Sequence, residues 1–204
     1  MINWQKQDRS IILASGSPRR KTILEQMGFS FEIIKPESIN EASYLECNDL
    51  HGSIQRLAVV KAGLVAQNHP DSLVIGADTI VVKDNRVLGK PENRDDAFAM
   101  LRFLSNSRHT VMTGVALQCV AEKFLKTSVS CTEVLFRNIS DCEINQYLSS
   151  DEYEDKAGAY AIQGRAMIFI EKIAGCYYNV VGLPVTSTIN LFQDFIDRKE
   201  SEDV

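Results

Sequence analysis

The stretch LASGSPRR, residues 13–20, gathers four side chains that could bind an anion, Ser15, Ser17, Arg19 and Arg20. A turn of small residues that leads into a helix aims unpaired backbone N–H groups at one point, where the helix dipole also favours negative charge. The hydroxyls and the forked guanidinium groups add donors for phosphate oxygens. The stretch therefore predicts a phosphate site, although a surface helix with solvated cations would carry the same residues.

Three later motifs offer further candidates. GADTIVV puts Asp78 at the end of an apolar run, where a carboxylate is costly to bury unless it has a partner or a metal. GKP supplies Lys90, and DKAGAYAIQG combines Lys156 and Gln163 with glycines, which is typical of a ligand-binding loop. A turn or a plain loop remains the alternative for each motif.

The composition limits the classes of protein to consider. A chain of 204 residues, 45% hydrophobic and 24% charged, suits one globular domain with a core of ordinary size. The net charge of −5 weighs against a broad nucleic-acid-binding surface. Five cysteines without a CxxC pair indicate reduced thiols in a cytosolic protein. No apolar run approaches the ~18 residues of a membrane span, and the start of the sequence is not typical of a signal peptide.

Apolar runs alternate with helical patterns along the chain, which favours an α/β fold. The S-x-x-E pattern from Ser140 to Glu143 is a capping box and predicts a short helix. Pro184 suits the first turn of a last helix. The expected strands are residues 11–14, 31–34, 73–83 (one interrupted strand or two), 110–120, 124–137, 167–173 and 179–181, and the other expected helices are 18–27, 53–67 and 93–104.

Taken together and in order, LASGSPRRKTIL, GADTIVV followed by GKP, DKAGAYAIQG and NVVGLP resemble the Maf family of nucleoside triphosphate pyrophosphatases. The similarity runs from about Ile11 to Phe195. It implies an α/β protein with a mixed, elongated, twisted sheet flanked by helices, and with two lobes around a central cleft. We expect residues 1–204 to form a single domain with frayed ends at 1–9 and 198–204. A cytoplasmic homodimer without nucleic-acid or membrane partners is expected as well.

The resemblance also implies an activity, the hydrolysis of a nucleoside triphosphate to the monophosphate and pyrophosphate with a divalent metal, Mg²⁺ or Mn²⁺. By motif position Asp78 would be the proton acceptor, and Glu41 with Asp78 would serve the metal. Substrate choice would fall to Arg19, Thr79 and Gln163. The phosphate-binding positions would be Ser15, Ser17, Arg20, Lys61 and Lys90, and Lys156 would line the base pocket.

Elementary chemistry supports parts of this assignment. Carboxylate oxygens suit a hard cation that also binds phosphate. Asp78 is a weak base at an ordinary pKa of ~3.9, so a metal-activated water would help it, and the roles of base and metal ligand both stay open for it. The assignment requires the serine–arginine turn to face the Asp78 carboxylate.

The choice of base can be argued a little further. The glutamine amide of Gln163 matches part of the acceptor–donor–acceptor edge of uracil or thymine. A cationic 7-methylguanine would prefer a carboxylate to Lys156. The loop resembles the dTTP/UTP-specific branch of the family, although Ala161 and Cys176 depart from the commoner residues. A 7-methyl-GTP-type pyrophosphatase and a non-catalytic nucleotide-binding regulator of septum formation remain the alternatives.

Overall fold

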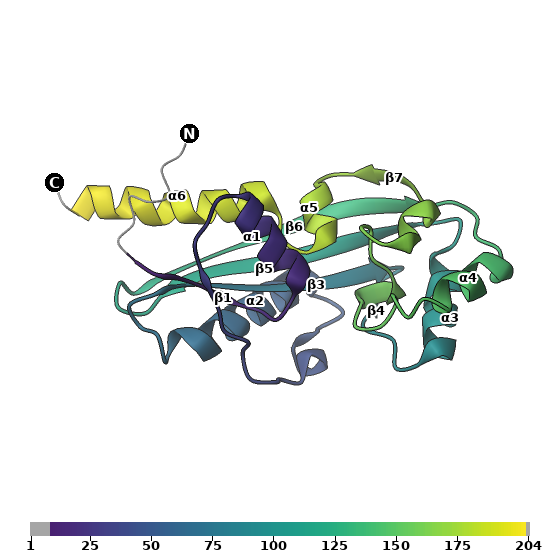
Figure 1. Cartoon of the computed structure of the whole chain (residues 1–204). Helices are drawn as coiled ribbons and strands as arrows, with labels where there is room; N and C mark the ends of the chain where they lie inside the picture. The colour runs from purple at the N-terminus through teal and green to yellow at the C-terminus, as the bar shows by residue number, and fades with distance from the viewer. Residues whose placement is uncertain (1–8, 203–204) are drawn as a thin grey trace. The chain divides into compact units, whose positions relative to one another are not determined.

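The computed structural model describes residues 9–202 and contains one mixed sheet flanked by helices (Figure 1). Its strands follow the order β2-β1-β3-β5-β6-β7, and β4 pairs with β3 outside this path. β1 runs parallel to both of its neighbours, whereas β6 and β7 are antiparallel. The predicted α/β class with a mixed sheet is therefore confirmed.

The chain divides into two compact units. Unit 1 comprises Met1–Asp78, Gly114–Val129 and Gly182–Val204, and unit 2 comprises Thr79–Thr113 and Ser130–Val181. Three of the boundaries fall inside strands, so β3, β5 and β6 each contribute residues to both units.

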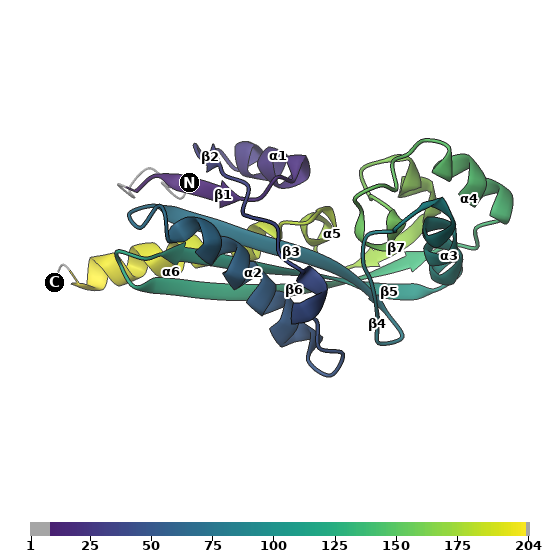
Figure 2. The same cartoon turned by 90° about the horizontal axis from the view of Figure 1, so that it is seen from below.

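Unit 1 is built around a helix that lies directly on the sheet. Apolar residues on one face of α2 pack against β1 and β3, and most of them are alanines. A Cβ atom at Gly76 of β3 would come within 2.3 Å of the Ala58 carbonyl oxygen, so helix and strand backbones approach as closely as glycine allows. Figure 2 shows α2 on this face of the strands. The elements of unit 1 are β1 (Ile11–Ala14), α1 (Pro18–Gln26), β2 (Glu32–Ile33), η2 (Glu41–Tyr44), α2 (Leu50–Ala66), α6 (Val185–Glu202) and parts of β3 (Leu73–Lys83), β5 (Arg108–Cys119) and β6 (Phe124–Phe136).

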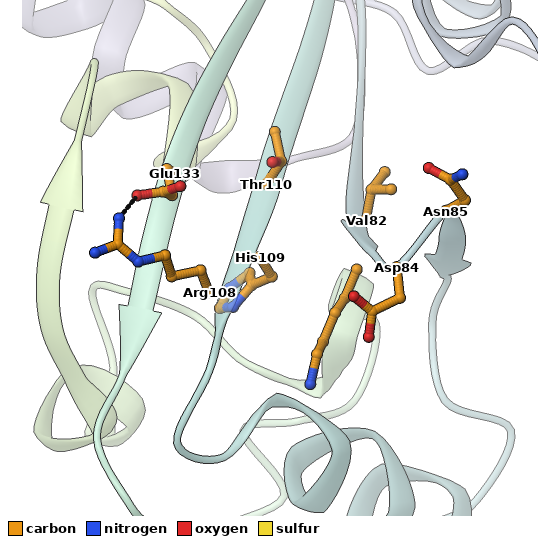
Figure 3. A pocket seen from close by; sticks show the side chains of 8 residues that line it. Val82, Asp84, Asn85, Arg108, His109, Thr110 and Glu133 are labelled. Atoms are coloured by element: carbon orange, nitrogen blue, oxygen red, sulfur yellow. Dashed lines mark hydrogen bonds and ion pairs between the residues drawn. The ribbon is translucent and has the colours of Figure 1, made fainter.

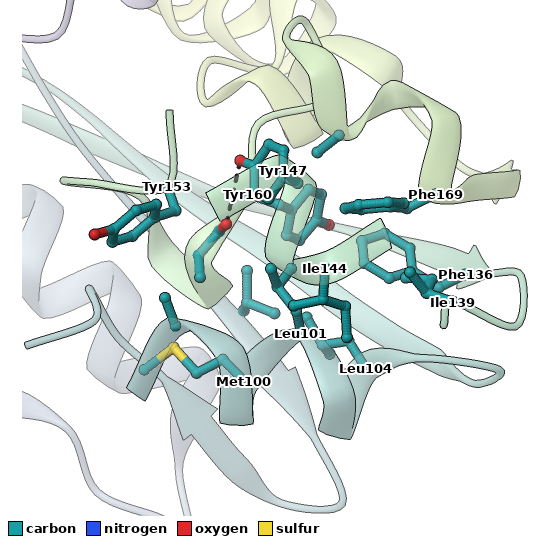
Figure 4. Close-up of a cluster of buried hydrophobic side chains, with 14 of the residues drawn as sticks. Met100, Leu101, Leu104, Phe136, Ile139, Ile144, Tyr147, Tyr153, Tyr160 and Phe169 are labelled. Carbon is teal, nitrogen blue, oxygen red and sulfur yellow. Dashed lines mark hydrogen bonds between the residues drawn. The ribbon is translucent and has the colours of Figure 1, made fainter. Parts of the chain in front are cut away.

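Unit 2 has an aromatic core. Phe136, Tyr147, Tyr160 and Phe169 meet edge to face or tilted, with ring centroids 4.9 to 6.1 Å apart (Figure 4). Helices α3 and α4 pack on one another and close this core. Besides its shares of β3, β5 and β6, unit 2 contains β4 (Arg86–Leu88), α3 (Arg94–Leu104), α4 (Asp141–Leu148), η3 (Ala157–Ala159), η4 (Arg165–Phe169), β7 (Ile170–Ala174) and α5 (Tyr177–Val181).

Local signals explain where the predicted elements succeed and fail. The capping box is present, because Ser140 accepts from the Glu143 N–H and Glu143 accepts from the Ser140 N–H. The prediction that α2 begins at residue 53 is wrong, because Asp49 caps the helix by accepting from the Gly52 N–H at 2.8 Å.

Three strand predictions need correction. β3 is one continuous strand, and the run predicted as a strand over 167–173 begins as the short helix η4. The predicted strand 179–181 belongs to the helix α5, where the Asn179 side chain reaches the sheet instead of the backbone. Short apolar runs do not distinguish strand from helix by periodicity. The frayed ends predicted at 1–9 and 198–204 lie partly outside the described residues, and α6 runs to Glu202.

Candidate active site

The serine turn between β1 and α1 is held by Ser15. Its hydroxyl accepts from the Ser17 backbone N–H at 3.2 Å and from Arg20 Nη1 at 3.0 Å. Ser17 occupies the N-cap position of α1, but its side chain makes no capping hydrogen bond, and Pro18 begins the helix as predicted. The Ser15 hydroxyl thus joins the turn to a cation.

Arg20 is built into unit 1. Its side chain is buried, and Nε donates to the backbone carbonyl of Gly182 at 2.8 Å. Burial lowers the pKa of the Arg20 guanidinium, while the negative charges of Asp78 and Glu41 act in the opposite direction. Burial also lowers the pKa of Arg19, which is half-buried beside it. An arginine remains charged under such a shift, so unit 1 holds a fixed positive charge near two carboxylates.

The pairing of β1 with β3 brings the turn to the Asp78 side of unit 1. The two strands are parallel, and Ala14 lies opposite Gly76. Ser15 follows Ala14 directly, and Asp78 stands two residues beyond Gly76. The turn and the carboxylate therefore lie toward the same end of these paired strands.

Lys61 joins two carboxylates. Its Nζ donates to Asp78 Oδ1 at 2.5 Å and to Glu41 Oε1 at 2.6 Å. The side chains of Lys61 and Asp78 are 13% and 10% exposed, whereas that of Glu41 is 45% exposed. Arg20, Glu41, Lys61 and Asp78 are called the charged cluster below. Its inner pair is shielded from water, and its outer carboxylate is open to it.

The close packing of α2 on the sheet fixes the position from which the Lys61 side chain extends. A Cβ atom at Gly114 of β5 would lie 2.4 Å from the Ile54 carbonyl oxygen, and Gly76 meets the helix one turn further on. Two glycines on neighbouring strands thus seat α2 against the sheet along its length. Lys61 leaves this seated helix between Ala58 and Ala62, the two residues that Gly76 contacts.

The charged cluster fits a divalent metal in the chemistry of its donors. Two carboxylates that converge on one ammonium are close enough to share a cation, and their oxygens are the ligands that Mg²⁺ and Mn²⁺ accept. Within residues 9–202 no group of three or more histidine, cysteine, aspartate or glutamate side chains is arranged to hold a metal. Two protein carboxylates would need phosphate oxygens and waters to complete a coordination shell.

In unit 2, Thr79 belongs to a chain of hydroxyls. Its Oγ1 lies 2.9 Å from Thr113 Oγ1, and Thr113 Oγ1 donates to the Asn179 backbone carbonyl at 3.0 Å. A carbonyl only accepts, so the single proton of Thr113 is used there. Thr79 must then donate to Thr113, which leaves the Thr79 oxygen able to accept from another group. The Asn179 side chain is fixed in turn by donating to the Val111 carbonyl at 2.9 Å.

The other predicted residues of unit 2 lie on its surface loops. Lys90 Nζ is 3.6 Å from Asp155 Oδ1, and both side chains are well exposed. Lys156 Nζ donates to the Glu154 carbonyl at 2.9 Å. Gln163 is exposed in the turn before η4. Lys90 thus lies close to the loop that carries Lys156. Gln163 lies at the C-terminal end of the same loop.

Sequence reasoning missed several residues that shape these regions. The stem of Lys35 lies 3.5 Å from the Cβ position of Gly16, which places another cation beside the serine turn. Thr113 and Asn179 carried no motif-level signal, because their role depends on strand pairing. The three histidines show no metal-ligand spacing, which predicts a surface or a structural role for each, and His109 is buried in unit 2.

One cavity of about 270 Å³ lies in unit 2, apart from every predicted site residue (Figure 3). It is lined by Val82, Lys83, Asp84, Asn85, Arg108, His109, Thr110 and Glu133, and Arg108 pairs with Glu133 at 2.5 Å. Its charged lining residues, Lys83 and Arg108 against Asp84 and Glu133, balance in formal charge. Among the described residues, no helix has the length and apolarity that crossing a membrane requires.

A mixed α/β sheet with a buried arginine beside a lysine-bridged carboxylate pair defines a protein equipped to handle anions. The chain belongs to the Maf family, since the family model for Maf-like proteins matches residues 10–195. It is 45% identical over 189 residues to a dTTP/UTP pyrophosphatase of Bacillus cereus (strain B4264), which covers 92% of this chain and 96% of that protein. A dTTP/UTP pyrophosphatase of Bacillus anthracis is 46% identical with the same coverage.

A solved structure gives a weaker likeness. The nucleoside-triphosphatase, or dITP/XTP pyrophosphatase, of Mycobacterium abscessus aligns with a TM-score of 0.41 at 16% identity, over 64% of this chain and 74% of that one.

Proposed function

We propose that this protein hydrolyses nucleoside triphosphates, dTTP and UTP above all, to the nucleoside monophosphate and pyrophosphate. The observation that carries the proposal is the charged cluster, in which Lys61 joins Asp78 and Glu41 beside the buried Arg20. The relatives named dTTP/UTP pyrophosphatase support the reaction and its substrate class.

Phosphate binding is assigned to the cations of unit 1. Arg20 is held by Ser15 and Gly182, so it meets the triphosphate without a large loss of side-chain entropy. Lys61 can exchange a carboxylate partner for a phosphate oxygen, because Glu41 is partly open to water. Arg19 and Ser17, which are half-buried at the turn, would add contacts to the outer phosphates. Such fixed cations neutralise the charge that grows on the leaving pyrophosphate.

The hydrolytic step follows from the position of Asp78. A water oxygen attacks the α-phosphorus, the bond from that phosphorus to the bridging oxygen breaks, and pyrophosphate leaves with the electron pair. Asp78 accepts the proton that the water loses, through the carboxylate that Lys61 now holds. A bound Mg²⁺ or Mn²⁺ at Glu41 and Asp78 would supply a more acidic water and further positive charge.

Base selection is assigned to unit 2. With its proton directed to Thr113, Thr79 would accept from a donor such as the N3–H of uracil or thymine, and cytosine has an acceptor at that position. Gln163 and Lys156 would contact the remaining polar edge, and Lys90 would reach a phosphate. A single functional domain, a homodimer and a cytoplasmic location complete the proposal.

The test is a turnover profile over about a dozen triphosphates, including dTTP, UTP, CTP, ATP and 7-methyl-GTP, with Mg²⁺ and with Mn²⁺. The expected products are the monophosphate and pyrophosphate, with dTTP and UTP preferred. Asp78→Asn should lose about 100- to 10,000-fold in kcat, the usual worth of a general base, and still bind nucleotide. Asp71→Asn, an exposed carboxylate paired with Arg9, is the matched control. A preference for 7-methyl-GTP, or no turnover at all, would overturn the assignment.

A further inference from the structure

The segment that carries Lys156 and Gln163 has a strained centre. Gly158 has φ of +69° and Ala159 has φ of +62°, and both residues are fully or nearly fully buried. A positive φ is costly for alanine, so a conformation of this kind persists only where its surroundings enforce it. Residues 157–160 are called the anchored segment below.

A backbone hydrogen bond and a close contact with a valine side chain enforce the conformation on one side. The Gly158 N–H donates to the Gly89 carbonyl at 3.0 Å, and a Cβ atom at Gly158 would lie only 3.1 Å from a Val81 methyl group. Val81 shares a face of β3 with Thr79, because side chains two apart in a strand point the same way. The anchored segment therefore packs on the face of β3 that carries Thr79.

Side-chain hydroxyls enforce it on the other side. Tyr147 donates its hydroxyl to the Ala159 carbonyl at 3.3 Å. The Tyr160 hydroxyl lies 2.7 Å from His109 Nε2, and the rings of the two residues meet nearly at right angles with centroids 5.5 Å apart. Among the described residues His109 Nδ1 has no hydrogen-bond partner, so the imidazole is held by the hydrogen bond between Nε2 and Tyr160.

The His109–Tyr160 pair is neutral. Burial raises the pKa of the Tyr160 hydroxyl far above the physiological range. Burial, with the charge of Lys83 second, lowers the pKa of His109 to about 4. A neutral hydrogen bond in an aromatic core is insensitive to salt and to physiological pH, which suits a fixed scaffold.

We propose that His109 and Tyr160 are positioning residues for base selection, since their hydrogen bond holds the anchored segment and so sets where Lys156 and Gln163 stand. This inference rests on the proposed function, because it takes those two side chains to select the base. A merely structural pair would stabilise unit 2 without any bearing on which triphosphate is preferred.

The variants separate these two roles. Tyr160→Phe removes the hydroxyl and keeps the ring. His109→Gln keeps a polar amide at the distance of Nε2 from the backbone, and His109→Met has a similar shape without the amide. Tyr153→Phe is the matched control, because Tyr153 is buried in the same aromatic core and its hydroxyl is not among the groups that hold the anchored segment (Figure 4).

The measurements are kcat and KM for dTTP, UTP, CTP and GTP, together with the melting temperature. Tyr160→Phe and His109→Met should raise KM for dTTP and UTP and lower their preference over CTP about tenfold, with kcat changed by no more than about twofold. His109→Gln should restore most of the preference, and Tyr153→Phe should leave it unchanged.

An unchanged preference in folded Tyr160→Phe overturns the inference, as does an equal loss on every triphosphate that follows the melting temperature. If Tyr160→Phe does not fold, the Gln and Met variants at position 109 decide, and equal preferences in that pair overturn it. Failure of the proposed function is recognised separately, because the unaltered protein would then show no preference for dTTP and UTP.

Discussion

The charged cluster of unit 1 and the anchored segment of unit 2 are positioned by opposite means. In the charged cluster Lys61 joins two carboxylates, and its helix is seated on the sheet through Gly76 and Gly114. The anchored segment contains no ion pair within residues 157–160, and it is held by hydroxyls, backbone hydrogen bonds and ring packing.

This difference fits two kinds of recognition. Charges that already have partners can exchange them for phosphate oxygens, and such contacts do not depend on the base. A neutral hydrogen-bond network in a packed core does not rearrange when a different base binds. It can therefore discriminate between bases by geometry alone. Salt should weaken binding through the charged cluster while leaving the ranking of bases unchanged.

The largest effect is expected at Lys61. Lys61→Met removes the ammonium between two carboxylates, so a buried Asp78 loses its paired charge and the phosphates lose a cation. We expect kcat/KM to fall about 100- to 1,000-fold on every triphosphate, as when one preorganised donor is removed. Steady-state kinetics on dTTP and CTP measures it, with Lys61→Arg as the charge-preserving control. A loss confined to one base would contradict the assignment of phosphate binding to the charged cluster and of base selection to unit 2.

A smaller effect is expected where α2 meets the sheet. Gly76→Ala would press a methyl group onto the Ala58 carbonyl and the Ala62 N–H, at 2.3 and 2.5 Å. Such overpacking costs about 3 kcal/mol, and the displaced helix should move Lys61 and lower kcat about tenfold.

Urea unfolding and turnover measure both quantities, and Gly63→Ala is the control. Its Cβ would lie an ordinary 3.6 Å from Gln118 Oε1, so alanine in this helix should stabilise the protein by about 0.5–1 kcal/mol. If Gly76→Ala keeps the kcat of the unaltered protein, the packing of α2 on the sheet does not determine the position of Lys61.

The sequence predicted those features of the fold and the candidate site that depend on local sequence patterns. The α/β class and the Ser140 cap follow from periodicity and turn chemistry, and both are present. The serine–arginine turn was found as a unit because strand end, turn and helix start are adjacent in the chain.

The rest depends on contacts that are distant in sequence. His109 and Tyr160 are separated by 51 residues, and Thr113 meets Asn179 across 66. No local pattern pairs a histidine with such a tyrosine, so the sequence predicted only a surface or a structural role for His109. For the same reason residues 179–181 were predicted as a strand, although burial of the Asn179 side chain against Val111 favours the helix α5.

Acid should destabilise unit 2 through His109. Its pKa is about 4 in the folded protein, against 6.5 as the ordinary value, so the unfolded chain binds the extra proton as pH falls. The stability that neutral His109 contributes is complete above pH 6.5 and declines toward pH 4, by about 2 kcal/mol at pH 5. Urea unfolding at pH 8 and pH 5 should show this decline in the unaltered protein and lack that component in His109→Gln. Equal declines in the two proteins would mean that burial and the charge of Lys83 do not keep this imidazole neutral.

The smallest effect is expected at Thr113, and it concerns the direction of one proton. Thr113→Val removes the acceptor that takes the Thr79 proton, and the valine is nearly isosteric. Without that acceptor, the Thr79 hydroxyl can turn its proton toward the base, where it suits the N3 acceptor of cytosine. The preference for UTP over CTP should fall about fivefold, equivalent to about 1 kcal/mol for one hydrogen bond. Thr110→Val, on the opposite face of β5, is the control, and a preference that survives Thr113→Val but not Thr110→Val would place the discriminating hydroxyl elsewhere.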